Sequence, residues 1–186
     1  MNKYLKLLLI ANSLFVFASS LIVPIYAALV LEVGGGVELA GLLVGTQFLA
    51  GTFFGIVVIK LADRKNRDER LIKANYLLRA LAWFFIFLFP SIPGLFLAQL
   101  IIGVSEAIGT PAFNALVSEH LDTKSHIKEW ATFGLVSNFI VAIASVVGGI
   151  VAVRLGFPLL FLMMSLLGLG SFFLLQLGGG KRQSTE

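Results

Sequence analysis

The sequence has 186 residues, of which 58% are hydrophobic and only 13% are charged, and its mean hydropathy is +0.97. Soluble domains are about half apolar and about a quarter charged, so this composition excludes a water-soluble globular protein. The chain has no cysteine, which excludes disulfides and thiolate metal sites. The formal net charge of +4 leaves nucleic acid and membrane as partners, and the placement of the basic residues decides between them.

Six runs of the sequence are long and apolar enough to cross a bilayer as helices. In chain order they cover residues 5–28, 39–61, 71–89, 95–117, 130–153 and 157–177. The first run is longer than the apolar core of a secretory signal, which spans about 7–15 residues, so we expect it to be retained. The connections are too short to fold alone. The sequence therefore predicts one all-α transmembrane domain over residues 1–177 and a polar tail over residues 178–186.

Basic residues predict the orientation of these helices. With the N-terminus inside, twelve of the 14 Lys and Arg residues are cytoplasmic, and only Arg154 lies on the opposite side. The positive-inside rule then places both termini in the cytoplasm, as an even number of crossings requires. The basic cluster within residues 64–73 is a cytoplasmic loop rather than a nucleic-acid-binding patch. Arg79, inside the third run, is interpreted as an anchor whose head reaches the cytoplasmic interface.

An internal repeat links the first and fourth runs. Residues 24–32 and 111–119 share Pro, an aromatic residue, Ala-Leu-Val and Glu at identical spacing. Three helices separate the copies, so the repeat predicts two inverted three-helix units, as found within halves of many secondary transporters. Chance similarity between apolar helices is the alternative. Pro24 and Pro111 each remove a backbone hydrogen bond and are expected to bend their helices.

Four glycines in the second and fifth runs offer small surfaces for close helix packing: Gly51, Gly55, Gly148 and Gly149. Each of them could assist a rocking motion of the helices, with simple packing as the alternative.

The loop after the second run reads Leu61-Ala62-Asp63-Arg64-Lys65-Asn66-Arg67-Asp68-Glu69-Arg70. It resembles the cytoplasmic signature of the major facilitator superfamily, Gly-x-x-x-Asp-Arg/Lys-x-Gly-x-Arg/Lys-Arg/Lys. Ile59 and Asn66 stand at its two glycine positions, and Arg70 falls one residue late. By this resemblance we expect a conformational motif at the cytoplasmic surface formed by Asp63, Arg64, Asn66, Arg67 and Arg70.

The fourth run carries a second resemblance to this superfamily. Gly103, Ala107, Pro111, Ala115 and Glu119 recur every four residues, similar to the ladder of small residues in the family's fourth helix. The resemblance implies a twelve-helix transporter of two halves that alternates between inward-open and outward-open states, and this chain resembles the N-terminal half only. It also implies a partner, either a second six-helix half or a second copy. Helices one, two, four and five would border the cavity, with three and six outside.

Glu106 is the sharpest candidate for function, because it lies near the middle of the fourth run, where an ionised carboxylate is costly. It is expected to carry a proton or bind a cation, with a structural ion pair as the alternative. Uncharged polar residues in four of the runs are expected either to line a solute path or to hydrogen-bond neighbouring helices. They are Ser19, Tyr26, Gln47, Asn114 and Asn138.

We therefore expect a multi-pass protein of the plasma membrane that forms half of a secondary transporter. It would move a small solute across the lipid bilayer by alternating access, with proton-coupled efflux as one option and a truncated or accessory non-transporting subunit as the alternative. An intramembrane protease is disfavoured, because His120 and His126 lie in a predicted loop and cannot reach Ser105 as a base. No enzymatic activity, cofactor, metal or nucleic-acid partner is expected.

Overall fold

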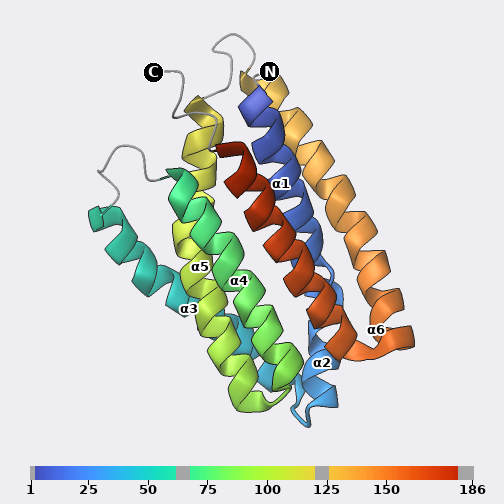
Figure 1. Ribbon diagram of the computed structural model, residues 1–186. Coiled ribbons are helices and arrows are strands. Elements are labelled where there is room, and N and C mark those ends of the chain that lie inside the picture. The colour runs from blue at the N-terminus through green and yellow to red at the C-terminus, as the bar shows by residue number, and fades with distance from the viewer. Residues whose placement is uncertain (1–2, 62–67, 120–125, 180–186) are drawn as a thin grey trace.

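The computed structural model describes residues 3–61, 68–119 and 126–179, and every regular element in these ranges is helical. The long helices form one elongated bundle (Figure 1). The start of α1 and the last turns of α6 lie at the same end of this bundle (Figure 1). The elements are α1 (Lys3–Ser20), the 3-10 helix η1 (Val23–Ile25), α2 (Tyr26–Glu32), α3 (Val37–Leu61), α4 (Asp68–Leu88), α5 (Ile92–Glu119) and α6 (His126–Gly179).

Five helical stretches among the described residues are long and apolar enough to cross a membrane, so the predicted count of six separate helices is not confirmed. They cover residues 4–32, 37–58, 68–88, 92–119 and 130–178. The last stretch contains the fifth and sixth predicted runs within the single element α6. From residue 180 onward, the predicted polar tail lies outside the described residues.

The helix α6 reverses direction at Gly156. This residue has φ 83° and ψ 162°, a backbone conformation that glycine adopts far more readily than residues with a side chain. Pro158 follows two residues later and cannot continue the helical hydrogen bonding of the preceding turn. The arms before and after Gly156 consequently run in opposite directions along the bundle (Figure 1). We call residues 126–155 the first arm and residues 157–179 the second arm.

Pro24 and Pro111 occupy different settings. Pro24 lies in η1, between the end of α1 at Ser20 and the start of α2 at Tyr26, so the first apolar stretch is interrupted there. The helix α5 instead continues through Pro111, whose side chain is exposed.

The core lies where α4 packs against α5, α1 and α6. Ile72, Tyr76, Ala80 and Trp83 recur every three or four residues along α4 and are all buried, so they form one face of the helix. Phe15 of α1 packs on this face, with its ring centroid 4.4 Å from that of Tyr76 and 6.0 Å from that of Trp83. Aromatic contacts of this kind fix the lateral position of α1 against α4.

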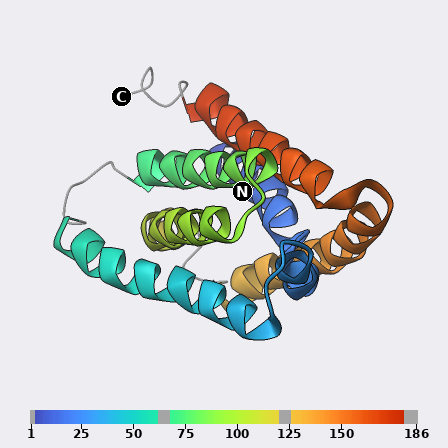
Figure 2. The same cartoon turned by 90° about the horizontal axis from the view of Figure 1, so that it is seen from below.

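By contrast, α3 and the first arm of α6 expose large apolar side chains over most of their length. Phe48, Phe53 and Phe54 are exposed on α3, and Phe139 and Val146 are exposed on the first arm. The helix α3 lies at the edge of the bundle, against α5 (Figure 2). Surfaces this apolar are unfavourable in water and are suited to lipid or to another helical bundle.

Glycines allow two close backbone approaches. A Cβ atom at Gly103 of α5 would meet the Gln47 carbonyl oxygen and would lie 3.0 Å from the Gly51 nitrogen of α3. A Cβ atom at Gly148 of α6 would meet the backbone of Leu21. Gly51 and Gly148 therefore lie at close contacts between segments, as expected from the sequence, whereas Gly55 and Gly149 face open space.

Candidate functional site

An ion pair joins α4 to α5 inside the apolar part of the bundle. Arg79 Nη2 lies 2.9 Å from Glu106 Oε2, and Gln47 Nε2 of α3 donates to the same oxygen at 3.1 Å. The Arg79 side chain is 14% exposed, whereas that of Glu106 is 45% exposed. The carboxylate thus lies at the boundary between the bundle interior and its surface, and the guanidinium lies inside.

The interpretation of Arg79 as an interfacial anchor is wrong. Its guanidinium pairs with Glu106, and its Cζ atom lies 5.5 Å from the ring centroid of Phe15, close enough for a cation–π interaction. Both contacts direct the side chain into the bundle, because a charge at this depth is stabilised more by a partner than by extension along an apolar surface.

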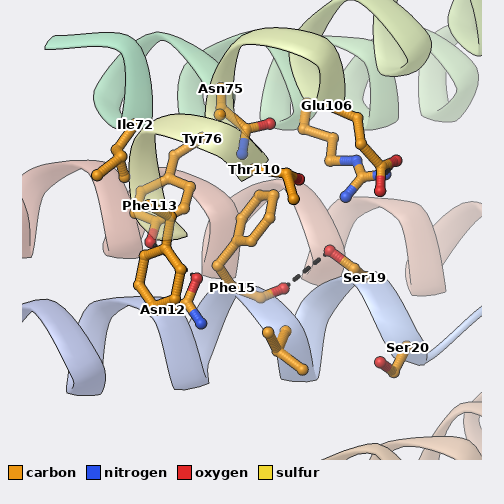
Figure 3. Close-up of a pocket in the computed structure, with 13 residues that line it drawn as sticks. Asn12, Phe15, Ser19, Ser20, Ile72, Asn75, Tyr76, Glu106, Thr110 and Phe113 are labelled. Carbon is orange, nitrogen blue, oxygen red and sulfur yellow. Dashed lines mark hydrogen bonds and ion pairs between the residues drawn. The ribbon is translucent and has the colours of Figure 1, made fainter. Parts of the chain in front are cut away.

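A cavity of about 190 Å³ adjoins the ion pair, between α1, α4 and α5 (Figure 3). The third crossing helix, α4, forms a large part of its wall. The expectation that this helix lies outside the cavity concerns the space between two halves and is not tested by this pocket. Its lining residues are Asn12, Phe15, Val16, Ser19, Ser20, Ile72, Asn75, Tyr76, Arg79, Glu106, Gly109, Thr110 and Phe113.

Polar side chains of the cavity are only partly hydrogen-bonded. The Tyr76 hydroxyl donates to Asn12 Oδ1 at 3.2 Å, and Ser19 Oγ donates to the Phe15 carbonyl at 2.9 Å. Asn75 is 6% exposed, and its Oδ1 atom has no hydrogen-bond partner among the described residues. The Asn75 amide occupies the space that the missing side chain of Gly109 leaves open. The cavity wall therefore combines apolar and polar side chains, and part of its hydrogen-bonding capacity is unused.

The comparisons with known proteins agree with this architecture. The family model of the Major Facilitator Superfamily matches residues 8–184. The chain belongs to this superfamily of membrane transport proteins. The fold is similar to the in meso crystal structure of the POT family transporter PepTSo, with a TM-score of 0.80 at 17% sequence identity. That similarity covers 97% of this chain and 38% of the transporter's chain. No curated protein sequence matches this chain.

The remaining predicted substrate and proton residues of this superfamily member are dispersed. Ser19 and Glu106 line the cavity, and Gln47 reaches it only through its bond to Glu106. The Tyr26 hydroxyl instead accepts a hydrogen bond from Gln99 Nε2 at 2.6 Å, between α2 and α5. The other two, Asn114 and Asn138, have exposed side chains and do not line this cavity.

The superfamily's cytoplasmic signature falls mostly outside the described residues, which do not include Asp63, Arg64, Asn66 or Arg67. Arg70 is described and is exposed in the first turn of α4. In the same turn, Glu69 accepts a hydrogen bond from the Tyr4 hydroxyl at 2.9 Å and pairs with Lys73 at 2.7 Å. These contacts connect the starts of α1 and α4.

Asn12, Asn75 and Thr110 were not predicted as site residues, although each is a polar residue within an apolar run. The signal that singled out Asn114 and Asn138 applied to them equally. Metal binding gains no support, because the described part of the chain contains no group of three His, Cys, Asp or Glu residues placed to hold an ion. His120 lies outside that part.

Proposed function

We propose that this chain is half of a secondary transporter that moves a small solute across the plasma membrane by alternating access. The observation that carries the proposal is the Arg79–Glu106 ion pair beside a cavity with polar side chains in its wall, in an apolar bundle of a transporter superfamily. Ionisable residues at membrane depth are costly and commonly mark solute or ion pathways. The chain spans 38% of the length of the solved transporter that it resembles.

In this proposal each arm of α6 crosses the membrane separately, which gives six crossings in two inverted units of three. The opposite directions of the two arms support this interpretation (Figure 1). Six crossings leave both termini on one side of the membrane, and the distribution of basic residues favours the cytoplasm as that side.

Glu106 is the proposed coupling group. Both hydrogen bonds to its carboxylate go to Oε2, and Oε1 has no partner among the described residues. A proton can therefore be added at Oε1 while Gln47 and Arg79 keep their positions. Protonation removes the negative charge that balances Arg79, so it weakens the attraction between α4 and α5. A change in that attraction would favour one of the transporter's two states.

The Glu106→Gln substitution is expected to lower proton-driven solute currents at least tenfold and to leave the bundle folded. The glutamine carbonyl can still accept the Arg79 hydrogen bond, but an amide does not take up or release a proton near neutral pH. Currents are measured on solid-supported membranes carrying proteoliposomes of the chain, alone and with a candidate second half. The probes are L-alanine, Ala-Ala, glucose and tetraphenylphosphonium.

The matched control is Glu38→Gln, which neutralises an exposed carboxylate at the start of α3, away from the cavity. This variant is expected to keep the wild-type currents. Unchanged proton-driven currents in the Glu106→Gln protein would contradict the coupling role.

The proposed partner is a second six-helix half or a second copy, bound through the exposed apolar faces of α3 and the first arm of α6. The chain has no cysteine, so single-cysteine variants carry one defined label. Benzophenone maleimide on Phe53→Cys or Val146→Cys is expected to photocrosslink the 20.1 kDa chain to a partner in native membranes. A product of twice that mass identifies a second copy, and another mass identifies a separate half.

The matched control for crosslinking is Phe173→Cys, another exposed position, on the second arm of α6. Figure 2 shows this arm on the opposite side of the bundle from α3. We expect it to label lipid only. Equal crosslinking from all three positions, or none from any, would contradict pairing through the α3 and first-arm faces.

An accessory membrane subunit without transport activity is the second candidate. It is favoured by the exposed apolar faces of α3 and the first arm of α6, through which the chain can bind a transporter without completing a solute path. Partner crosslinking combined with no flux, alone or with that partner, would select this candidate over the transporter half.

A further inference from the structure

The wall of the cavity between α1, α4 and α5 carries unused hydrogen-bond donors and acceptors. Asn75 Oδ1 and Glu106 Oε1 are acceptors without a partner among the described residues. The Arg79 guanidinium donates through one nitrogen to Glu106, and no other hydrogen bond from it is made within the described chain. Asn12 uses its oxygen to accept from Tyr76, which leaves its amide NH₂ as a donor in the cavity wall.

The buried amide oxygen of Asn75, which has no hydrogen-bond partner among the described residues, points to a ligand. A side chain that is 6% exposed normally has its polar atoms hydrogen-bonded, because a buried carbonyl oxygen without a donor is costly. The amide is held in the cavity wall because it fills the space above Gly109. Figure 3 shows Asn75 extending from α4 toward Thr110 and the cavity. A donor supplied from within the cavity would satisfy it.

The charges of the site select the kind of ligand. Arg79 and Glu106 neutralise each other as a pair, so a solute with a net charge would leave one of them unbalanced. A solute with both charges separated by a few ångströms can instead use the free positions of both. Its carboxylate would pair with guanidinium N–H groups, and its ammonium would donate to Oε1 and to the Asn75 amide.

We propose that this cavity binds a small zwitterion, a free amino acid of about the size of alanine or serine. In this assignment Arg79 binds the carboxylate, and Asn75 and Glu106 bind the ammonium group. The role of the bound amino acid as the transported solute rests on the transporter function proposed above. The binding itself stands on the geometry of this cavity.

The cavity volume limits the solute. An apolar cavity of about 150 Å³ admits benzene, a molecule of six non-hydrogen atoms, so about 190 Å³ suits a solute of six to eight such atoms. Alanine and serine fall in this range. Phe15 and Phe113 form apolar walls that leave no room for a long side chain. Amino acids with large side chains are therefore expected to bind weakly.

All the residues of this assignment belong to one bundle, so a second half is unnecessary for binding. The test accordingly uses the chain alone in lipid nanodiscs, with tritiated L-alanine and a scintillation proximity readout. Saturable binding is expected. Propionate lacks the ammonium group, ethylamine lacks the carboxylate, and lactamide lacks both charges. Each of these three is expected to displace alanine at least tenfold more weakly than unlabelled alanine or serine does.

Asn75→Leu keeps the shape of the side chain, removes the amide and is expected to raise the Kd for alanine at least tenfold. The matched control is Gln99→Leu. Gln99 is also 6% exposed with an unpartnered amide oxygen among the described residues, but it lies outside the cavity. It is expected to leave the Kd unchanged. Gly109→Ala provides a second variant, because its Cβ would push the Asn75 amide into the cavity and weaken alanine binding.

Three results would overturn the assignment: no saturable alanine binding to the wild-type chain, displacement by lactamide as strong as by serine, or equal losses in the Asn75→Leu and Gln99→Leu proteins. Alanine binding without proton-driven flux would support the amino-acid site and contradict the transporter function. Flux of another solute without alanine binding would support the transporter function and contradict the amino-acid site.

Discussion

Replacing Glu106 with leucine is expected to lower the free energy of unfolding by about 3 kcal/mol, because Arg79 would keep its charge inside the bundle without a partner. Breaking a buried pair costs about 3–5 kcal/mol, and the 45% exposure of the Glu106 side chain places this pair at the lower end of that range. The measurement is equilibrium unfolding by SDS in mixed micelles, followed by far-UV circular dichroism. Glu106→Gln should lose much less, since its amide oxygen still accepts from Arg79.

The control for this prediction is a double-mutant cycle with Arg79→Met. Alone, Arg79→Met is expected to cost less than Glu106→Leu, because the carboxylate left behind is half-exposed and keeps its hydrogen bond from Gln47. Combined with Glu106→Leu, it removes both charges and should recover most of the lost stability. Simple addition of the two single losses in the double variant would contradict a direct coupling between the two side chains.

Apolar runs of the sequence predicted most of the helices because lipid requires them. A chain in hydrocarbon must satisfy its backbone hydrogen bonds internally, so each apolar run of sufficient length is helical. The run predicted at 39–61 corresponds to α3 at Val37–Leu61, and the run at 95–117 to α5 at Ile92–Glu119. The interruption between α1 and α2 was less predictable, since Pro24 could have bent a continuous helix instead of separating two elements.

Arg79 shows where prediction from one helix at a time fails. Its depth was compatible with a head at the interface, but its partner lies on another helix, 27 residues along the chain. A comparison of the positions of Arg79 and Glu106 along their helices could have found the pair. Arg79 lies eleven residues past the start of α4, and Glu106 lies thirteen residues before the end of α5. At about 1.5 Å per residue, both lie about 17–20 Å from the same end of two antiparallel helices.

The cavity could not be predicted for a different physical reason. In a soluble helix the polar face shows which side is buried, but lipid is as apolar as the protein interior. The sequence therefore carries little information about which way a neutral amide points. Asn75 turned out to be buried in the cavity wall, and Asn138 exposed, although both are single amides in apolar runs. Only the packing of α4 against α1 and α5 separates them.

Gly148→Ala is expected to lower the free energy of unfolding by about 1–3 kcal/mol, measured by the same SDS titration. The added Cβ would meet the backbone carbonyl of Leu21, just beyond the end of α1. A backbone group cannot rotate away as a flexible side chain can, so the first arm of α6 has to move away from α1. That movement loosens the contact between α1 and α6, the helix on which α1 mainly packs.

The neighbouring residue provides the control for this prediction. Gly149 has no atom within 4 Å of the position of an added Cβ, so Gly149→Ala meets open space. Alanine favours a helix over glycine by about 1 kcal/mol, and the Gly149→Ala protein is therefore expected to be as stable as the wild type or more stable. The two substitutions make the same chemical change one residue apart, so a difference between them measures the backbone contact with Leu21. Equal stabilities would show that α1 and the first arm are not in close contact at Gly148.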